Sequence, residues 1–465
     1  MQFNQAVAVQ EGWSAQQRQG RIIVQDDIIE EHIQALDRAT PDLKNPPNVI
    51  VDYRTGAAST VFSALAERKG YQIVVLDSAD SEIPDAIFEK TGKPVLIALN
   101  ATPSPGMEAG IWDPSKPEAY DQIKKVQLRI YGDPRFKGKQ FAGIVFDGDG
   151  DRSGFLDEGT FDEASRSWRP GEIVAPDRML MSFYQRFVLE NIAGIKALNK
   201  LGHTVKLALD VRASAVIVQV LQDIAQKQKI QIDGEFIAAG YPNHRGFVRK
   251  EVSAISELLA AGQSKLSAEE LAAVHALMRT YTSAEASGHF FFNVLRQEQF
   301  FRLKTVVDDG ITSSIIYLRL VDTLGDFELK GAAYREPSVK KADAIFPINT
   351  VTNEVRLEKA PADVTKKQAL AERIIMKFAE DNAGLIPMPV SELAERVALA
   401  RSNPPERQSA QESLLLVDGV RLVLNNGLWV LFRKSNTSAV ITFKAEADAA
   451  GKEAQMGNLL SRLLT

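Results

Sequence analysis

The sequence predicts an α/β protein in which consecutive α/β domains with mixed sheets are followed by a C-terminal α+β domain. Three patterns support this fold class. From Pro47 onward, short β-branched and apolar runs alternate with helical segments, which is typical of βαβ units. A similar alternation begins again near residue 204. From about Phe346 onward, helical segments are mixed with closely spaced strands, which favours an α+β arrangement.

The first α/β repeat contains four predicted strands. Residues 48–53 (NVIVDY) form a β-branched run that suits a buried strand. A turn and a helical stretch from Ser59 to Lys69 follow it. The apolar runs that complete the sheet are Tyr71–Asp77, Pro94–Leu99 and Phe141–Phe146. Strands separated in this way predict a parallel sheet with crossover helices.

The second repeat is similar to the first. Its first strand ends in Asp210-Val211-Arg212, as the earlier one ends in Asp52-Tyr53-Arg54, and this weak similarity suggests duplicated domains. A helical insertion then lies between Glu251 and Ser283, in which Ser267 and Glu270 form a capping-box pattern. The elements predicted before the insertion are a strand at Thr204–Asp210, a helix at Val216–Gln226 and a strand at Ile230–Ile237.

Breaks in the pattern divide the chain into four segments. Polar, turn-rich connectors lie at 159–177 and 334–344, and Asp27 with Glu30 forms a capping-box pattern that starts a helix. We therefore expect an N-terminal arm and linker helix at 1–46, an α/β domain at 47–165, a second α/β domain at 166–335 and a C-terminal α+β domain at 336–465.

The composition excludes several classes of protein. The 465 residues include 55 Lys and Arg against 60 Asp and Glu, a net charge of −5, whereas nucleic-acid-binding domains are normally basic. Cysteine is absent, which excludes disulfides, thiol nucleophiles and Cys-ligated metals. No apolar run approaches the ~18 residues needed to span a bilayer, and the N-terminus lacks the pattern of a signal peptide. We therefore expect a cytoplasmic protein that binds neither nucleic acids nor membranes.

An acidic loop follows the last strand of the first repeat. It reads Asp147-Gly148-Asp149-Gly150-Asp151-Arg152, directly after the apolar run FAGIVF. The glycines let the backbone curl so that three carboxylates point toward one position, where a hard divalent cation (magnesium, calcium or manganese) would relieve their repulsion. The alternatives are a solvated acidic turn and an EF-hand. The EF-hand is disfavoured because Arg152 occupies the position that needs glycine, and because a strand precedes the loop.

Two further loops carry clusters of polar groups. The segment 284–289 (AEASGH) places Glu, Ser and His beside a glycine, which suits the binding of sugar hydroxyls, although a plain polar turn is an equal alternative. The segment 433–438 (RKSNTS) combines two cations, several hydroxyls and backbone N–H groups in one turn. This combination suits phosphate binding, and a charged hairpin is its alternative.

Together the three loops resemble those of the α-D-phosphohexomutase family, the phosphomannomutases and phosphoglucomutases. The family's metal loop, DGDGDR, is matched without change, its sugar loop (GEMSGH or similar) by AEASGH, and its phosphate loop (RxSNTEP or similar) by RKSNTSA. The resemblance implies a cytosolic isomerase of carbohydrate metabolism with four domains around one cleft. In such enzymes a phosphoserine and Mg²⁺ interconvert hexose 1-phosphate and hexose 6-phosphate through a bisphosphorylated sugar.

The family's functional residues can be carried over onto the matching positions. Arg152 would offset charge on the transferring phosphoryl group, and a basic residue expected in the third domain would be Arg249. The resemblance further implies a Mg²⁺ site at Asp147, Asp149 and Asp151, sugar contacts at Glu285, Ser287 and His289, and a phosphate clamp at Arg433, Ser435, Asn436 and Thr437.

The sequence departs from the family in two ways. The first of the four domains should carry the phosphorylated serine in a Ser-His-Asn-Pro context, and no such string occurs. We therefore expect residues 1–46 to be a remnant of that domain, and the phosphoserine to come from a missing segment or a separate polypeptide. In addition, Ala284, Ser438 and Ala439 replace Gly, Glu and Pro of the family loops. These changes leave open a non-catalytic sugar-phosphate-binding protein or regulatory subunit, and the preferred hexose is not specified.

Overall fold

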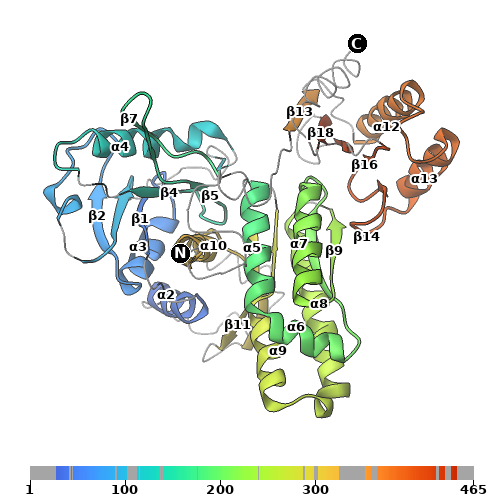
Figure 1. Ribbon diagram of the computed structural model, residues 1–465, viewed down its shortest axis with the longest axis horizontal. Coiled ribbons are helices and arrows are strands. Elements are labelled where there is room, and N and C mark those ends of the chain that lie inside the picture. The colour runs from blue at the N-terminus through green and yellow to red at the C-terminus, as the bar shows by residue number, and fades with distance from the viewer. Residues whose placement is uncertain are drawn as a thin grey trace, which may run out of the picture.

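A computed structural model gives the fold, and three groups of elements follow one another in it (Figure 1). We call residues 28–169 the first unit, 176–323 the middle unit and 351–447 the C-terminal unit. The residues that the structure describes are 28–40, 43, 46–89, 92–101, 113–114, 116–136, 138, 140–174, 176–238, 240–285, 288–297, 302–323, 351–357, 364–425, 429–434 and 441–447.

The first unit is a doubly wound sheet of five strands in the order β2-β3-β1-β4-β5. The first four are parallel, and β5 runs antiparallel to β4. The strands are β1 (Asn48–Asp52), β2 (Gln72–Leu76), β3 (Val95–Leu99), β4 (Phe141–Phe146) and β5 (Ser153–Leu156). The helical elements are α2 (Ile28–Ala39), α3 (Ala58–Arg68), η2 (Asp85–Ile87), η3 (Pro117–Tyr120) and α4 (Asp121–Tyr131).

Alternation along β1 assigns the two faces of this sheet. Val49 and Val51 belong to the same core cluster as Phe62 of α3. Ile50, which points the other way, shares a second cluster with Ile123 of α4. Because successive strand residues face opposite sides, α3 and α4 cover opposite faces, and the carboxyl ends of the strands are left for loops.

The middle unit combines two small sheets with long helices, drawn in green and yellow in Figure 1. β8 and β9 are parallel, whereas β10, β11 and β12 form an antiparallel meander. The strands are β8 (Val205–Asp210), β9 (Ile232–Ile237), β10 (Thr282–Ala284), β11 (Phe290–Gln297) and β12 (Arg302–Asp308). The helical elements are α5 (Pro176–Glu190), α6 (Ile192–Lys200), α7 (Ala215–Gln228), α8 (Tyr241–Gly262), η4 (Gln263–Lys265), α9 (Ala268–Thr280) and α10 (Gly310–Thr323).

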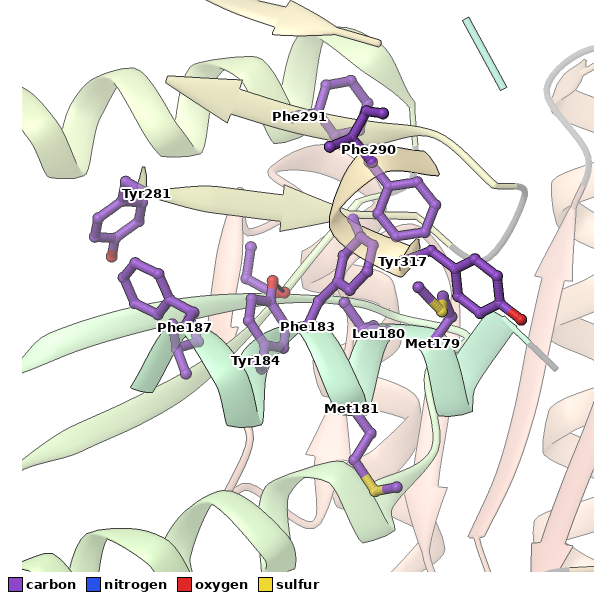
Figure 2. Packing of buried hydrophobic residues seen from close by; sticks show 14 of the residues in the cluster. Met179, Leu180, Met181, Phe183, Tyr184, Phe187, Tyr281, Phe290, Phe291 and Tyr317 are labelled. Atoms are coloured by element: carbon purple, nitrogen blue, oxygen red, sulfur yellow. Dashed lines mark hydrogen bonds between the residues drawn. The ribbon is translucent and has the colours of Figure 1, made fainter. Parts of the chain in front are cut away.

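An aromatic layer holds the middle unit together beside the candidate site. Figure 2 shows side chains of α5 facing Tyr281, the residue before β10, and those of β11. The ring centroids of Phe183 and Phe290 are 4.6 Å apart, and those of Phe187 and Tyr281 are 5.4 Å apart. Tyr317 of α10 stacks on Phe155 of β5 at 4.3 Å. The first and middle units thus share one continuous core, which fixes their loops relative to each other.

The C-terminal unit is an antiparallel sheet in the order β13-β18-β17-β16-β15. One face carries Leu422, Phe432 and Phe443, which cluster with residues of α12 and α13. The strands are β13 (Val351–Leu357), β15 (Leu414–Leu415), β16 (Val420–Val423), β17 (Trp429–Lys434) and β18 (Ile441–Ala447), and the helices are α12 (Val364–Asp381) and α13 (Val390–Ser402).

The predicted α/β and α+β elements are confirmed, and in both α/β repeats their ends differ from the prediction by no more than two residues. The predicted capping box is also present, since the Glu270 N–H donates to Ser267 Oγ and the Ser267 N–H donates to the Glu270 carboxylate. The N-terminal arm and the connector at 334–344 lie outside the described residues.

Among the features that were not predicted, two concern the joins between the units. The connector at 159–177 contains an antiparallel hairpin, β6 (Thr160–Asp162) with β7 (Ser167–Arg169). In addition, β14 (Arg407–Ser409) leaves the C-terminal segment and pairs with β9 of the middle unit. Among the described helices, none is both long and apolar enough to cross a membrane.

Candidate functional site

The acidic loop lies at the carboxyl end of β4 and brings its three carboxylates together. Asp147, Asp149 and Asp151 each offer one oxygen, and these oxygens lie within 4.8 Å of one another. Asp147 is fully buried, and its Oδ1 accepts hydrogen bonds from the backbone N–H groups of Gly150 (3.0 Å) and Arg152 (3.2 Å). The local backbone therefore curls as the glycines allow, with Gly150 at φ +80°.

Arg152 offsets part of the negative charge of the loop. Its Nε donates to Asp147 Oδ2 at 2.5 Å, and its Nη1 lies 3.7 Å from Asp113 Oδ1. Burial raises the pKa of Asp147 to about 6; Arg152 opposes the shift, and the nearby Asp151 carboxylate adds to it. A carboxylate that is this costly to ionise favours a bound cation. The three oxygens, with no soft ligand among them, fit a hard cation such as Mg²⁺.

The turn after β1 packs against the backbone of the acidic loop. The Ala57 N–H donates to the Gly148 carbonyl oxygen at 3.0 Å. A Cβ atom at Gly56 would lie only 2.7 Å from the same oxygen, which is closer than real carbon–oxygen contacts. Position 56, in the turn that the sequence predicts after the first strand, therefore requires glycine.

The sugar loop joins the acidic loop directly. Arg152 and His289 form an antiparallel β-bridge, and the Ser153 N–H donates to the Gly288 carbonyl at 3.3 Å. The His289 Nδ1 lies 4.0 Å from Asp151 Oδ2. Within the loop, the Glu285 N–H donates to the His289 carbonyl at 2.9 Å. Glu285 and His289 are thus held beside the metal loop, while Ser287 lies outside the described residues.

The cation that contacts the sugar loop is Arg212, which was not predicted as a site residue. Its Nη2 lies 3.3 Å from Glu285 Oε1 and 2.5 Å from Asp210 Oδ2. Burial opposes its charge, but Asp210 and Glu285 outweigh burial and raise the pKa of Arg212. Burial likewise disfavours the charge of Asp210, yet Arg212 holds the pKa of Asp210 below its usual range. The repeated Asp-x-Arg strand end was the sequence signal for this pair.

His244 is a second residue that the sequence left unassigned. It is fully buried on α8, its Nδ1 lies 2.6 Å from Ser283 Oγ, and its ring stacks on Phe291 at 5.0 Å. Burial is the main cause that lowers the pKa of His244, which favours the neutral form of the ring. Arg249, the basic residue predicted to bind substrate, lies further along the same helix and is exposed. Its role stays a prediction.

At the start of the phosphate loop, Arg433 lies at the end of β17. Its Nε donates to Asp418 Oδ2 at 2.7 Å. The negative charge of Asp418 also contributes to raising the pKa of Arg212, so it acts on both guanidinium groups. Ser435, Asn436 and Thr437 lie outside the described residues, and their phosphate-binding role stays a prediction.

These groups follow one another in a series across the three units. Arg433 contacts Asp418, whose negative charge acts on Arg212. Arg212 contacts Glu285, and His289 connects Glu285 to the carboxylates of the acidic loop. Carboxylates suited to a cation at one end are therefore connected to cations suited to a phosphate at the other. The intervening acids and bases provide hydrogen-bonding groups for a polyhydroxylated ligand.

Comparison with solved structures identifies the fold. A phosphoglucomutase/phosphomannomutase family protein from Burkholderia thailandensis matches with a TM-score of 0.53 and 16% sequence identity, over 94% of this chain and 64% of that chain. This chain shares the fold of that phosphoglucomutase/phosphomannomutase family protein. The predicted fold class is thus confirmed, and the resemblance is confirmed at the level of the fold.

Two structures of N-acetylphosphoglucosamine mutase from Aspergillus fumigatus are more distant matches. They have TM-scores of 0.44 and 0.40 and identities of 13% and 14%, and both cover 94% of this chain. This chain covers 63% and 64% of theirs, and the second is a complex with GlcNAc-6P and magnesium. The chain therefore spans less than two thirds of the phosphohexomutase structures that it matches. No family model and no curated protein matches the sequence.

Proposed function

We propose that this chain provides the metal-, sugar- and phosphate-binding parts of a phosphohexomutase. The reaction is the interconversion of hexose 1-phosphate and hexose 6-phosphate through a bisphosphorylated sugar. The observation that carries the proposal is the set of contacts that joins the acidic loop, Glu285 and Arg212, together with the charge of Asp418, which acts on Arg212 and pairs with Arg433. A ligand with hydroxyls in the middle and phosphates at its ends matches this order of groups.

Each part of the series has a role in this reaction. Asp147, Asp149 and Asp151 would hold Mg²⁺, which when bound supplies positive charge for phosphoryl transfer. Arg152 lies beside these carboxylates and would offset negative charge on the phosphoryl group. Phosphoryl transfer depends mainly on positioning and charge stabilisation, and the buried ion pairs supply both.

The sugar and the distant phosphate would be held by the other two loops. Glu285 accepts from the Gly240 N–H at 3.2 Å and is paired with Arg212, so its carboxylate is fixed in place to accept from sugar hydroxyls. Ser287 and His289 would complete the sugar contacts. Arg433, with Ser435, Asn436 and Thr437, would clamp the phosphate that does not react.

The phosphoryl donor is the remaining requirement. No Ser-His-Asn-Pro string occurs in the 465 residues, and nucleophilic catalysis needs an activated nucleophile. We therefore propose that a phosphoserine domain outside these residues, in a longer form of the protein or in a separate polypeptide, completes the site. The phosphoserine would give its phosphoryl group to the sugar monophosphate, and the bisphosphate would return its other phosphoryl group to the serine.

The test separates binding from turnover. Calorimetry with glucose 1,6-bisphosphate and Mg²⁺ should detect binding to the 465-residue chain, and Arg433→Ala should weaken it about tenfold or more, as expected for a charge-assisted phosphate contact. Arg373→Ala, an exposed position on α12, is the matched control and should bind as the wild type does.

Turnover is then measured by ³¹P NMR with glucose 1-phosphate. The chain alone should show no interconversion, and addition of a phosphoserine domain from a phosphohexomutase should produce it. A different result would support a non-catalytic sugar-phosphate binder: the wild type binds the bisphosphate, Arg433→Ala loses this binding, and no complementation produces turnover. Absence of binding to the wild-type chain would refute the proposal.

A further inference from the structure

The C-terminal sheet uses its second face to contact the middle unit. Arg421 pairs in register with Leu431, and Leu431 pairs with Lys444, across three adjacent strands. Directly opposed residues on neighbouring strands point to the same side of a sheet. Trp429, two positions before Leu431, shares this side, and it clusters with Leu431 and with Val211 of the middle unit.

Two cations on this face bind three successive carbonyl oxygens of the middle unit. Arg421 Nη1 donates to the carbonyls of Val211 (3.0 Å) and Ala213 (2.7 Å). Lys444 Nζ donates to the carbonyl between them, that of Arg212, at 2.7 Å. Arg421 is 1% exposed and Lys444 is 8% exposed. The guanidinium of Arg421 lies between the rings of Phe236 and Trp429, with centroids at 4.3 and 3.8 Å, so its orientation is fixed.

The peptide bound in this way is the one that carries Arg212. Its side chain makes the ion pairs with Asp210 and Glu285, so a shift of its backbone moves the cation of the sugar loop. On the other side of the contact, Arg433 lies two residues beyond Leu431 on β17, and therefore on the same face of the sheet. The contact thus connects the backbones of both site arginines.

We propose that Arg421 and Lys444 are positioning residues that hold Arg212 and Arg433 at a fixed separation, so that the two arginines grip one sugar phosphate together. This inference rests on the proposed function, because the sugar phosphate proposed there is the common ligand of the two cations. Two groups held in one rigid frame bind a ligand more tightly than the same groups on units that move independently, since the ordering entropy is lost before binding.

The test uses Arg421→Lys, which keeps the charge but loses the forked geometry, and Lys444→Met, in case the first variant does not fold. With folded protein at low temperature, we expect either variant to weaken glucose 1,6-bisphosphate binding about tenfold, within the range of coupling between residues in contact. The Mg²⁺ affinity of the acidic loop should stay within about twofold of wild type. Arg396→Lys, at a 51% exposed side chain on α13, is the matched control.

A double-mutant cycle excludes a merely structural role. In the Arg433→Ala background the separation of the two arginines no longer matters, so Arg421→Lys should weaken binding by less than about twofold. The same tenfold loss in both backgrounds, or unchanged binding in the folded single variants, would overturn the inference.

Amide hydrogen exchange gives a readout that needs no ligand. The Ala213 N–H donates to the Asp210 carbonyl, and the Arg212 N–H donates to the Asp210 carboxylate. Both amides should exchange about tenfold faster in Arg421→Lys, whereas those of β1 and β4 should not change. If the wild type does not bind the bisphosphate, the proposed function is refuted, whatever the exchange data show. Unchanged exchange at 212 and 213 would refute the positioning role independently.

Discussion

His289 and Asp151 come from loops of different units, and the imidazole Nδ1 lies 4.0 Å from the carboxylate oxygen. The backbone of His289 also pairs with Arg152, the residue after Asp151. A bridge between the backbones of the two loops fixes their spacing more firmly than side-chain contacts alone, because it leaves few free dihedral angles. Substitution of a side chain in one loop should therefore weaken metal binding or sugar binding alone, while the two loops stay in contact.

The first prediction concerns the exposed member of the acidic cluster. Asp149→Asn should reduce Mg²⁺ affinity about 10- to 100-fold, since one anionic ligand is lost, while the fold is retained because Asp149 is exposed. Calorimetry measures the affinity, and circular dichroism in a chelator checks the fold. Asp80→Asn, at a 74% exposed carboxylate paired with Lys125, is the control. Equal Mg²⁺ affinity in wild type and Asp149→Asn would show that the cluster is only an acidic turn.

The second prediction concerns the turn behind the acidic loop. Gly56→Ala would place a methyl group 2.7 Å from the Gly148 carbonyl oxygen, so the acidic loop must shift. We expect about 2–3 kcal/mol of lost stability, as for other overpacking substitutions, and weaker Mg²⁺ binding. Gly246→Ala, on a helix and with no atom within 4 Å, is the control and should stabilise by about 0.5–1 kcal/mol. If both variants unfold at the same denaturant concentration, the close contact is not present in solution.

How well the sequence predicts a feature depends on how far apart in the chain its residues lie. The buried run of β4, the DGDGDR loop and the Ser267–Glu270 capping box are contiguous patterns, and their structures follow from local rules. The Arg212–Glu285 pair spans 73 residues, and the Arg421–Val211 contact spans 210. No periodicity encodes such pairs, because they depend on how the units pack. For this reason Arg212, the cation that contacts Glu285, was not predicted as a site residue, whereas Arg249 came from the family resemblance and stays a prediction.

The pairing of β14 with β9 illustrates the same limit within the fold. Residues 407–409 are short and polar, so nothing local indicates a strand. Arg407 Nη1 lies 3.0 Å from Glu235 and 3.1 Å from Glu251, both buried in the middle unit. The strand is held by its backbone pairing with β9 and by these ion pairs, which are tertiary contacts that a single segment cannot reveal.

The third prediction concerns pH. Burial raises the pKa of Glu158 from 4.5 to about 7, so between these values the folded chain holds a proton that the unfolded chain has lost. The free energy of unfolding should therefore fall as pH rises from about 4.5 to 7, by roughly 2–3 kcal/mol from this group. Urea titrations of wild type and Glu158→Gln should agree below pH 4.5, separate between pH 4.5 and 7 with the variant more stable, and differ by a constant amount above pH 7. Glu163→Gln, at an exposed position of the hairpin, should instead follow the wild type at every pH.

The last prediction separates the structural role of Arg212 from its role in binding. Asp210 is fully buried, and Arg212 holds its pKa below the usual range. Arg212→Met should cost about 3–5 kcal/mol, because it leaves a buried carboxylate without its partner. The double variant Asp210→Asn with Arg212→Met removes that uncompensated charge, so most of the stability should return. Binding of glucose 1,6-bisphosphate should stay at least about tenfold weaker in the double variant, because the cation itself is absent. Denaturant midpoints and calorimetry on the two variants make the distinction. If binding recovered together with stability, Arg212 would serve only to compensate Asp210, and the cation for the sugar phosphate would have to be sought elsewhere in the series.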